Sequence, residues 1–191
     1  MDLVLVGQPG SGKTLLWERL GRLAGAGTGG ATPGAPPEVR AWSATRGHGP
    51  WRRRVCLVDT PGLTDRVHPD PARRRAQALA LERIAAAAGL LHVVDASRAG
   101  QQGEEALAGV DQALSLLGAR RGGYAVVATK MDLPWAATGL VLVRRCLQPG
   151  ILVPVSALTG QGLGLLRRLL WRGPWQAVPG AARGHRTSLK A

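Results

Sequence analysis

A glycine-rich segment near the start of the chain, residues 7–14 with the sequence GQPGSGKT, has the residue types that bind phosphate. Residues 2–6 before it form an apolar run typical of a buried strand, and residues 15–23 after it have apolar positions at helical spacing. Glycines let such a loop wrap with its backbone N–H groups pointing inward, at the positive end of the following helix. We therefore predict a phosphate-binding loop with contacts from Gly10, Ser11 and Gly12.

Side chains at two strand ends have the chemistry of a nucleotide–magnesium site. In the loop, we expect Lys13 to reach the β- and γ-phosphates and the Thr14 hydroxyl to ligate Mg²⁺. Asp59 ends a second apolar run and is followed by Thr-Pro-Gly. An acid in that place can hold the Mg²⁺ shell through water, and the Gly62 amide can hydrogen-bond a γ-phosphate and so sense its presence.

Two further segments have the chemistry to recognise a base. Thr129, Lys130 and Asp132 follow the apolar run 124–128 in the sequence TKMD. A carboxylate at position 132 can accept hydrogen bonds from N1–H and the exocyclic amine of guanine, a donor pair that adenine lacks. The Lys130 stem can cover one face of the base. Later in the chain, Ser156, Ala157 and Leu158 would place a backbone amide near the guanine oxygen.

The elements that position these segments alternate along the chain. We expect strands at 2–6, 54–59, 89–95, 124–128 and 151–155, helices at 15–23, 71–89, 104–117, 136–147 and 162–172, and a possible edge strand at 38–42. Continuous apolar strands alternating with helices predict an α/β fold, a mostly parallel sheet with helices on both faces. Ligands bind beyond the carboxyl ends of the strands in such sheets, which is where all four segments fall.

The chain resembles the small G domains of the translation-factor-related GTPases, and it is most similar to the Era-like and ferrous-iron-transporter G domains. The matching residues are GQPGSGKT at 7–14, DTPGL at 59–63, HVVDAS at 92–97, TKMD at 129–132 and VSALTGQGLGLLRRLL at 155–170. The resemblance covers about residues 1–172. It implies a Ras-like P-loop fold, Mg²⁺-dependent GTP binding, and slow hydrolysis to GDP and phosphate that switches two loops. It also implies that Lys13, Thr14, Asp59 and Gly62 contact phosphate or Mg²⁺, and that Lys130, Asp132, Ser156 and Ala157 contact guanine.

Three departures from that family concern catalysis. The related domains bind Mg²⁺ through a threonine in the first switch loop, whereas this chain has Pro36 there and Thr32 as the nearest substitute. Leu63 stands where Ras-type enzymes use glutamine to orient water, which indicates a different mechanism. Gly10 replaces the asparagine of potassium-activated members, so potassium activation is not expected.

An arginine from residues 39–54 or from an activating partner could stabilise the transition state. One alternative is therefore a degenerate G domain that binds GTP or GDP without turnover.

Composition predicts one domain, residues 1–172, followed by a basic and flexible tail, residues 173–191. The 191 residues have a net charge of +13, and nearly all of the basic residues are arginines. Codon usage in a GC-rich genome produces such a bias, and the charge also suits RNA, the ribosome or an anionic membrane. A basic ribosome- or RNA-associated factor is thus the second alternative. No secretory signal or spanning segment is expected, so we predict a cytoplasmic location. His92 is expected to be a packed core residue.

Overall fold

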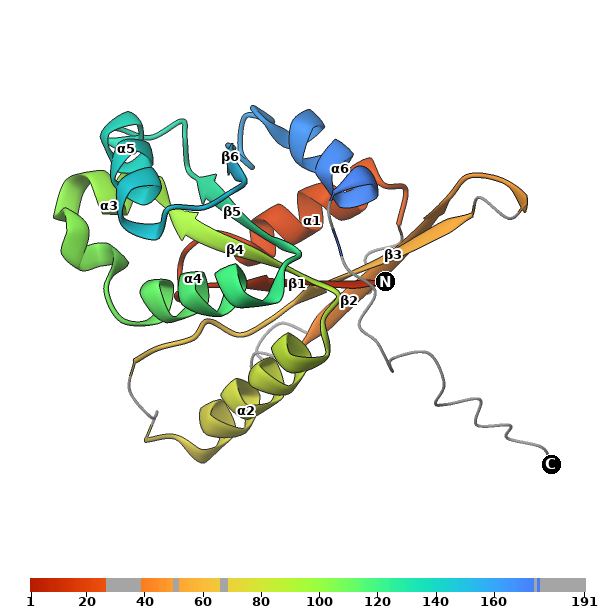
Figure 1. Ribbon diagram of the computed structural model, residues 1–191, viewed down its shortest axis with the longest axis horizontal. Coiled ribbons are helices and arrows are strands. Elements are labelled where there is room, and N and C mark those ends of the chain that lie inside the picture. Colours follow the sequence, from red (N-terminus) through yellow and green to blue (C-terminus); the bar gives the residue numbers. More distant parts are fainter. Residues whose placement is uncertain (27–38, 50–51, 66–68, 174, 176–191) are drawn as a thin grey trace.

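The computed structural model describes residues 1–26, 39–49, 52–65, 69–173 and 175. They form a six-stranded sheet in the order β2-β3-β1-β4-β5-β6 (Figure 1). Five strands are parallel: β1 Asp2–Val6, β3 Arg53–Asp59, β4 Gly89–Asp95, β5 Tyr124–Thr129 and β6 Leu152–Pro154. The edge strand β2, Arg40–Arg46, pairs antiparallel with β3. The predicted α/β architecture is confirmed, and Figure 1 shows the β2–β3 hairpin extending beyond the rest of the sheet.

Helices cover both faces of the sheet because side chains alternate along each buried strand. In β1, Leu3 and Leu5 pack with α1 (Lys13–Leu23) and α6 (Leu163–Arg172) on one face. Val4 and Val6 face the other way, toward α2 (Pro71–Ala86) and α4 (Val110–Arg121). Beyond them, α3 (Ala96–Gln102) and α5 (Ala136–Leu147) complete that second layer against β4 and β5. The sheet is therefore buried on both faces, as its apolar strands predict.

The structure corrects the predicted helix at 104–117. A short 3-10 helix, η2 (Glu104–Leu107), is followed by a break at Gly109, and α4 begins at Val110. Gly109 has a φ of 62°, a left-handed conformation that glycine adopts at little cost and that a continuous helix would not allow. The break lets the start of α4 approach the phosphate loop, as described below.

Other elements differ from the predictions mainly at their ends. The edge strand runs to Arg46 rather than ending at residue 42, and α2 ends at Ala86 because β4 begins at Gly89. Helix α3 was not predicted. It packs so closely on α5 that a Cβ atom on Gly139 would collide with the main chain of Ala96. Of the described helices, none is long and apolar enough to cross a membrane.

Most of the predicted tail, residues 173–191, lies outside the described residues, so its flexibility stays a prediction. Trp175 is described, and its indole Nε1–H donates to the carbonyl oxygens of Leu169 (3.0 Å) and Leu170 (3.2 Å) in α6. The ring also packs against the core beneath β1 and α6. The described contacts therefore continue slightly past the end of α6, to Trp175.

Candidate functional site

The glycine-rich segment forms a wrapped loop between β1 and α1, as predicted. Gly7, Gly10 and Gly12 have φ angles of 141°, 75° and 94°, all in the region that side chains rarely adopt. At Gly7 a Cβ atom would also run into the main chain of Val93 in β4. Gly12 immediately precedes α1, so the loop ends at the positive end of that helix. This is the geometry of an anion site made from backbone amides.

The Lys13 side chain is buried inside this loop. Its Nζ donates to the carbonyl oxygens of Gly7 (3.1 Å) and Gln8 (2.7 Å) and to the hydroxyl of Ser11 (3.3 Å). Burial lowers the pKa of Lys13 from 10.5 to about 8, and the carboxylates of Asp59 and Asp111 oppose this shift. The ammonium group is thus fixed at the centre of the loop, where it would face an anion bound by the amides.

Thr14 and Asp59 form a pair of oxygen ligands next to the loop. Thr14 Oγ1 donates to Asp59 Oδ2 over 2.8 Å. The other carboxylate oxygen, Oδ1, is buried and has no hydrogen-bond partner among the described residues. Burial raises the pKa of Asp59, while the Thr14 hydrogen bond and Lys13 lower it. A hydroxyl beside a carboxylate with an unpartnered oxygen fits Mg²⁺, which takes hard oxygen ligands and keeps several of its waters.

These groups face one cavity of about 390 Å³. Its lining consists of the loop, the end of β3 and one cation from β2: Pro9, Gly10, Gly12, Lys13, Thr14, Leu15, Arg40, Asp59, Thr60, Pro61 and Gly62. Arg40 comes from the stretch 39–54 in which the sequence suggested a stabilising arginine. It pairs in register with Asp59, and its charge lowers the pKa of that carboxyl.

The segment after β3 lies directly on the phosphate loop. A Cβ atom on Gly62 would stand 2.6 Å from the backbone nitrogen of Pro9, so a side chain there would push the two segments apart. The Leu63 amide donates to the carbonyl oxygen of Gly7 over 3.1 Å. The Leu63 side chain is buried in the core between the sheet and α2. The side chain at position 63 therefore points away from the cavity and cannot orient a water molecule there, as the glutamine of Ras-type enzymes does.

The end of β5 is tied to the phosphate loop by Thr129. Its hydroxyl lies 2.6 Å from the carbonyl oxygen of Ser11 and 3.0 Å from that of Val94. Lys130 follows with a left-handed φ of 60° and forms an ion pair with Asp95 over 2.6 Å. Asp95 also caps α3 by accepting a hydrogen bond from the Arg98 amide. The loop and the 129–132 segment are thus held at the same edge of the sheet.

The two segments assigned to the base lie side by side. The Met131 amide donates to the carbonyl oxygen of Val155 over 3.2 Å, which joins the end of β5 to the loop after β6. Ser156 is buried, and its hydroxyl accepts from the Thr159 amide over 3.0 Å. Asp132 and Leu158 are exposed. All predicted site residues in the described part therefore gather at one edge, whereas Thr32 and Pro36 lie outside the described residues.

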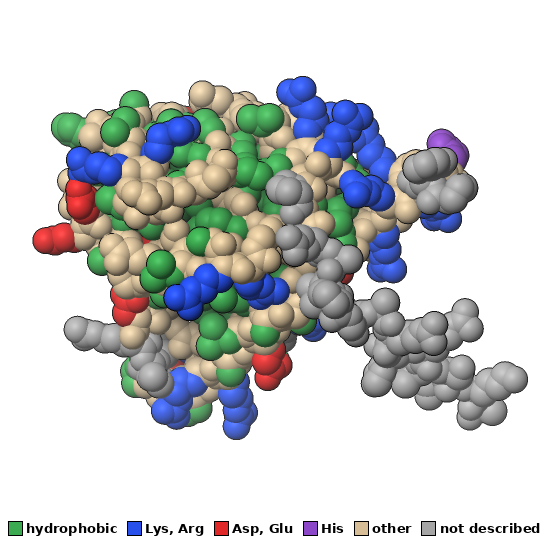
Figure 2. Space-filling view, viewed as in Figure 1, with side chains coloured by type: hydrophobic (Ala, Val, Ile, Leu, Met, Phe, Trp, Pro, Cys, Tyr) green, Lys and Arg blue, Asp and Glu red, His purple; other side chains and the backbone are tan. Residues whose placement is uncertain are grey.

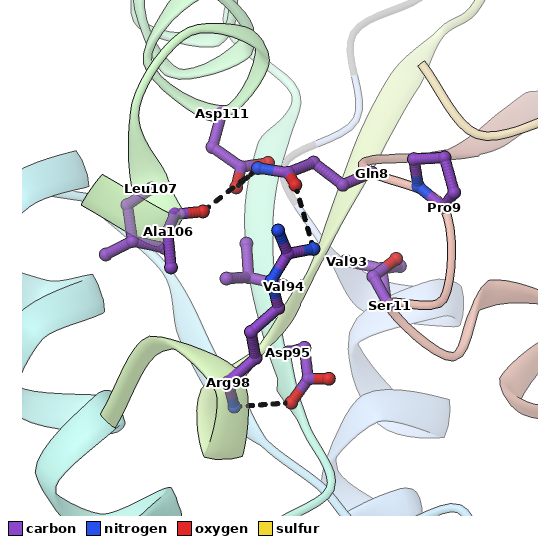
Figure 3. Close-up of a pocket in the computed structure, with 10 residues that line it drawn as sticks. All are labelled: Gln8, Pro9, Ser11, Val93, Val94, Asp95, Arg98, Ala106, Leu107 and Asp111. Atoms are coloured by element: carbon purple, nitrogen blue, oxygen red, sulfur yellow. Dashed lines mark hydrogen bonds between the residues drawn. The ribbon is translucent and has the colours of Figure 1, made fainter. Parts of the chain in front are cut away.

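Sequence reasoning missed a polar network behind the loop (Figure 3). Gln8 reaches from the loop toward the start of α4, where its Nε2 donates to Asp111 Oδ2 (2.8 Å) and to the carbonyl oxygen of Ala106 (3.0 Å). Arg98 donates to the Gln8 side-chain oxygen from the other side over 3.2 Å. The Gln8 amide is therefore held at both of its polar ends.

The same network continues into the core through His92. The Asp111 Oδ1 atom lies 2.8 Å from His92 Nε2, and His92 Nδ1 lies 2.7 Å from the Tyr124 hydroxyl. Burial raises the pKa of Tyr124, so its hydroxyl stays protonated and can donate to Nδ1. His92 is fully buried, which confirms it as a core residue. Among the described residues no cluster of His, Cys, Asp or Glu has the arrangement of a metal site.

A phosphate loop on the first strand of a mostly parallel sheet, with Asp59 and the 129–132 segment at the same edge, is the arrangement of a P-loop GTPase domain. The comparison with protein families leads to the same class. The family described as 50S ribosome-binding GTPase matches residues 2–127, and the chain belongs to this family. The matched region ends just before the two segments assigned to guanine.

Solved structures share the fold. Era from Aquifex aeolicus, as a variant bound to GDP·AlF4⁻, matches with a TM-score of 0.62 and 22% identity over 93% of this chain and 57% of its own. Era in complex with MgGDPNP and part of 16S ribosomal RNA matches with a TM-score of 0.61 and 23% identity over 89% of this chain and 55% of its own. The cytosolic domain of L. pneumophila FeoB matches with a TM-score of 0.57 and 20% identity over 94% of this chain and 72% of its own.

The similarity to these solved structures is one of fold, because the sequence identities are only 20–23%. The chain spans a little over half the length of the two Era chains. No curated protein matches it significantly by sequence. The resemblance to the Era-like and FeoB-like G domains is confirmed at the level of the fold and of the family.

Proposed function

We propose that this protein is a guanine-nucleotide-dependent switch that slowly hydrolyses GTP to GDP and phosphate with Mg²⁺. One observation carries the proposal: Thr14 and a half-partnered Asp59 line the same cavity as the buried Lys13 and the backbone of Gly62. These are a metal-binding pair, a cation for the phosphates and a backbone amide for the γ-phosphate. The arrangement supports binding of a nucleoside triphosphate with its metal.

The chain's residues divide the work of phosphoryl transfer, which depends on positioning and charge neutralisation. The loop amides and Lys13 hold the β- and γ-phosphates in place. Thr14 and Asp59 would hold Mg²⁺, which supplies further neutralisation of the phosphate oxygens when bound. Arg40 enters the cavity from β2 and provides a second protein cation for charge that develops in the transition state. The attacking water must be positioned by a group other than Leu63.

Guanine selectivity is assigned to Asp132, together with Lys130 and the 156–158 loop. Within the described part of the chain, the exposed Asp132 carboxylate forms no hydrogen bond or ion pair. Its two oxygens are thus free to accept from the N1–H and the amine of guanine. The buried Ser156 fixes the adjoining loop, whose backbone amides at Ala157 and Leu158 would face the guanine oxygen.

The switch itself is assigned to the contact between Gly62 and the phosphate loop. Because Gly62 abuts Pro9 and the Leu63 amide holds Gly7, a γ-phosphate hydrogen-bonded to the Gly62 amide acts on the start of the segment that leads to α2. Binding of GTP rather than GDP is then expected to shift residues 62–65. This is the expected route from the nucleotide to a partner.

Phosphate release from GTP in the presence of Mg²⁺ tests this function. Turnover that is slow in the wild-type chain and absent in Lys13→Ala supports the proposal, because the variant removes the buried cation. Tight binding of GTP and GDP with no phosphate release by the wild-type chain would identify a degenerate G domain instead. A Lys13→Ala variant as active as wild type would reject the site.

A second proposal concerns the partner. The net charge of +13 and the Era structure solved with 16S ribosomal RNA favour RNA, in a cytoplasmic setting such as the ribosome. An anionic membrane surface and an activating protein are the competing partners. Binding of labelled RNA by the full chain, compared between its GTP- and GDP-loaded forms, separates a nucleotide-controlled RNA contact from simple charge attraction.

A further inference from the structure

Arginine side chains gather around α6, where the described elements carry few carboxylates. We call this surface the α6 face and define it by Arg22, Arg167, Arg46, Arg53 and Arg172. The elements around this surface are α1, β2, β3 and α6. Their described carboxylates are Glu18 and Asp59, and Asp59 belongs to the nucleotide cavity. None of the five arginines forms an ion pair within the described part of the chain. Figure 2 shows Lys and Arg side chains over α6 and along the neighbouring hairpin.

The α6 face contains two hollows, one at each end of the helix. The first, of about 360 Å³, lies at the start of α6, where Arg19, Arg22 and Arg167 surround a floor formed in part by Leu163 and by Ala157 and Leu158 of the loop assigned to guanine. The second, of about 590 Å³, lies at the end of α6. Its lining is Arg46, Gly47, Arg53, Trp171 and Arg172. Each hollow thus combines three guanidinium groups with an apolar or aromatic surface.

Two arginines of the second hollow, Arg46 and Arg53, are held by contacts with Trp171. The Arg46 guanidinium lies 5.8 Å from the centre of the Trp171 ring, a cation–π contact. Arg53 donates to the carbonyl oxygen of Trp171 over 2.7 Å. A guanidinium has five N–H donors in a fixed fork, so further donors stay available for phosphate oxygens. Pre-positioned arginines lose less conformational entropy when a ligand binds.

The separation of the hollows indicates the length of the ligand. Helix α6 has 10 residues, Leu163–Arg172. At 1.5 Å per residue it is about 15 Å long. A phosphate ion or a mononucleotide fills one hollow, whereas a polynucleotide strand brings a phosphate to both. Guanidinium planes and apolar floors also suit unstacked bases, which single strands offer and duplexes do not.

We propose that the α6 face binds a single strand of RNA that runs along α6 from one hollow to the other. This inference rests on RNA being the partner, as proposed above, and is independent of GTP hydrolysis.

Two variants with equal charge changes test it. The face variant combines Arg22→Glu, Arg167→Glu and Arg172→Glu. The control variant combines Arg74→Glu, Arg75→Glu and Arg120→Glu, which are exposed arginines on α2 and α4. Fluorescence anisotropy measures the binding of a labelled single-stranded RNA of about 16 nucleotides to each full chain over a series of salt concentrations. Thermal unfolding followed by circular dichroism is measured in parallel and reports whether each variant is folded.

The face variant is expected to bind RNA at least about tenfold more weakly than the control variant at equal salt. Its slope of log affinity against log salt should be smaller by about 2, because three lost phosphate contacts each account for about 0.7 in a single strand. Uridine monophosphate should not displace the RNA at concentrations comparable to the RNA sites. Both variants should unfold cooperatively, as the wild-type chain does.

Several outcomes would overturn the inference. Equal loss of RNA affinity in both variants would show an effect of net charge alone. Displacement by uridine monophosphate would indicate a site for small anions. Binding of phosphatidylglycerol vesicles but not RNA, lost in the face variant, would assign the face to a membrane. If the wild-type chain binds no RNA, the proposed RNA partner fails as well, whereas RNA binding that both variants retain rejects the α6 face alone.

Discussion

Gln8 Nε2 donates a 2.8 Å hydrogen bond to Asp111 Oδ2, and this bond joins the phosphate loop to the first turn of α4. The other Asp111 oxygen lies 2.8 Å from His92 Nε2 in the core strand β4. Asp111 is buried, and its two oxygens serve these two partners. The position of the loop therefore depends on a carboxylate that does not face the nucleotide cavity.

Replacement of Asp111 by alanine tests that dependence. The change removes one of the two acceptors of the Gln8 amide and the partner of the buried His92 Nε2. An unsatisfied buried donor costs about 1–3 kcal/mol. We expect the free energy of unfolding in urea to fall by about 3 kcal/mol, with weaker GDP binding because Gln8 is released. Gln112→Ala, at the exposed neighbouring position, should change the free energy of unfolding by less than about 0.5 kcal/mol. Equal effects of the two variants would contradict a supporting role for Asp111.

Lys13 predicts opposite effects of pH on stability and on nucleotide binding. Burial lowers the pKa of Lys13 from 10.5 to about 8 in the folded chain. Between these values the unfolded chain binds more protons, so this group makes the free energy of unfolding rise with pH. Phosphates require the charged amine, so the affinity for GDP should fall about fivefold between pH 8 and 9. Calorimetric titrations from pH 7 to 9 measure the affinity directly.

Lys13→Met is the control for this pH dependence. The variant has no proton to lose, so its increase in stability between pH 8 and 10.5 should be smaller than that of the wild-type chain. Its GDP affinity should be low at every pH. A wild-type affinity for GDP that stays constant up to pH 9 would show that the buried amine keeps its proton and that burial does not control it.

Asp59→Asn is expected to remove the effect of Mg²⁺ while leaving most of the nucleotide contacts. The amide lacks the negative charge that holds the ion and its water shell, but it can still accept from Thr14. Affinity for GTP should rise with Mg²⁺ in the wild-type chain and change little with Mg²⁺ in the variant. In EDTA the two should bind within a few-fold of each other. An undiminished Mg²⁺ effect in the variant would exclude Asp59 from the metal site.

Arg40→Ala separates a role in turnover from a role in binding. Arginines that stabilise the transition state of phosphoryl transfer contribute about 10³–10⁵ in rate. Because Arg40 lines an open cavity and is half-buried, we expect a fall in phosphate release toward the lower end of that range, with GDP affinity nearly unchanged. Arg74→Ala on α2 serves as the control. Unaltered release by Arg40→Ala would assign transition-state stabilisation to another group.

The edge of the sheet that holds the site could be predicted from the sequence because its information is local. The phosphate loop, Asp59 and the 129–132 segment each follow an apolar strand, and the carboxyl ends of parallel strands meet at one edge. Arg40 was predicted only as part of the stretch 39–54. Its place in the cavity depends on the register of β2, which pairs Arg40 with Asp59.

The network behind the loop could not be predicted, because it joins residues by packing rather than by spacing. Gln8 and Asp111 are 103 residues apart, and the break at Gly109 that directs Asp111 inward appears in the sequence as an ordinary helical glycine. Helix α3 was missed for a related reason. It has seven residues and no apolar periodicity, and the Asp95 cap and its packing on α5 stabilise it.

Asp132 provides the most direct test of the central claim, that the site binds guanine nucleotides. Competition binding with labelled GDP should show no displacement of the label by excess ATP from the wild-type chain. Asp132→Ala should weaken GDP binding by roughly 100-fold or more, since two charge-assisted hydrogen bonds are lost at about 1.5–3 kcal/mol each. Glu82→Ala, which removes an exposed carboxylate on α2, should leave GDP binding unchanged. Displacement by ATP as strong as by GTP, or an Asp132→Ala variant that binds GDP like the wild-type chain, would contradict the assignment.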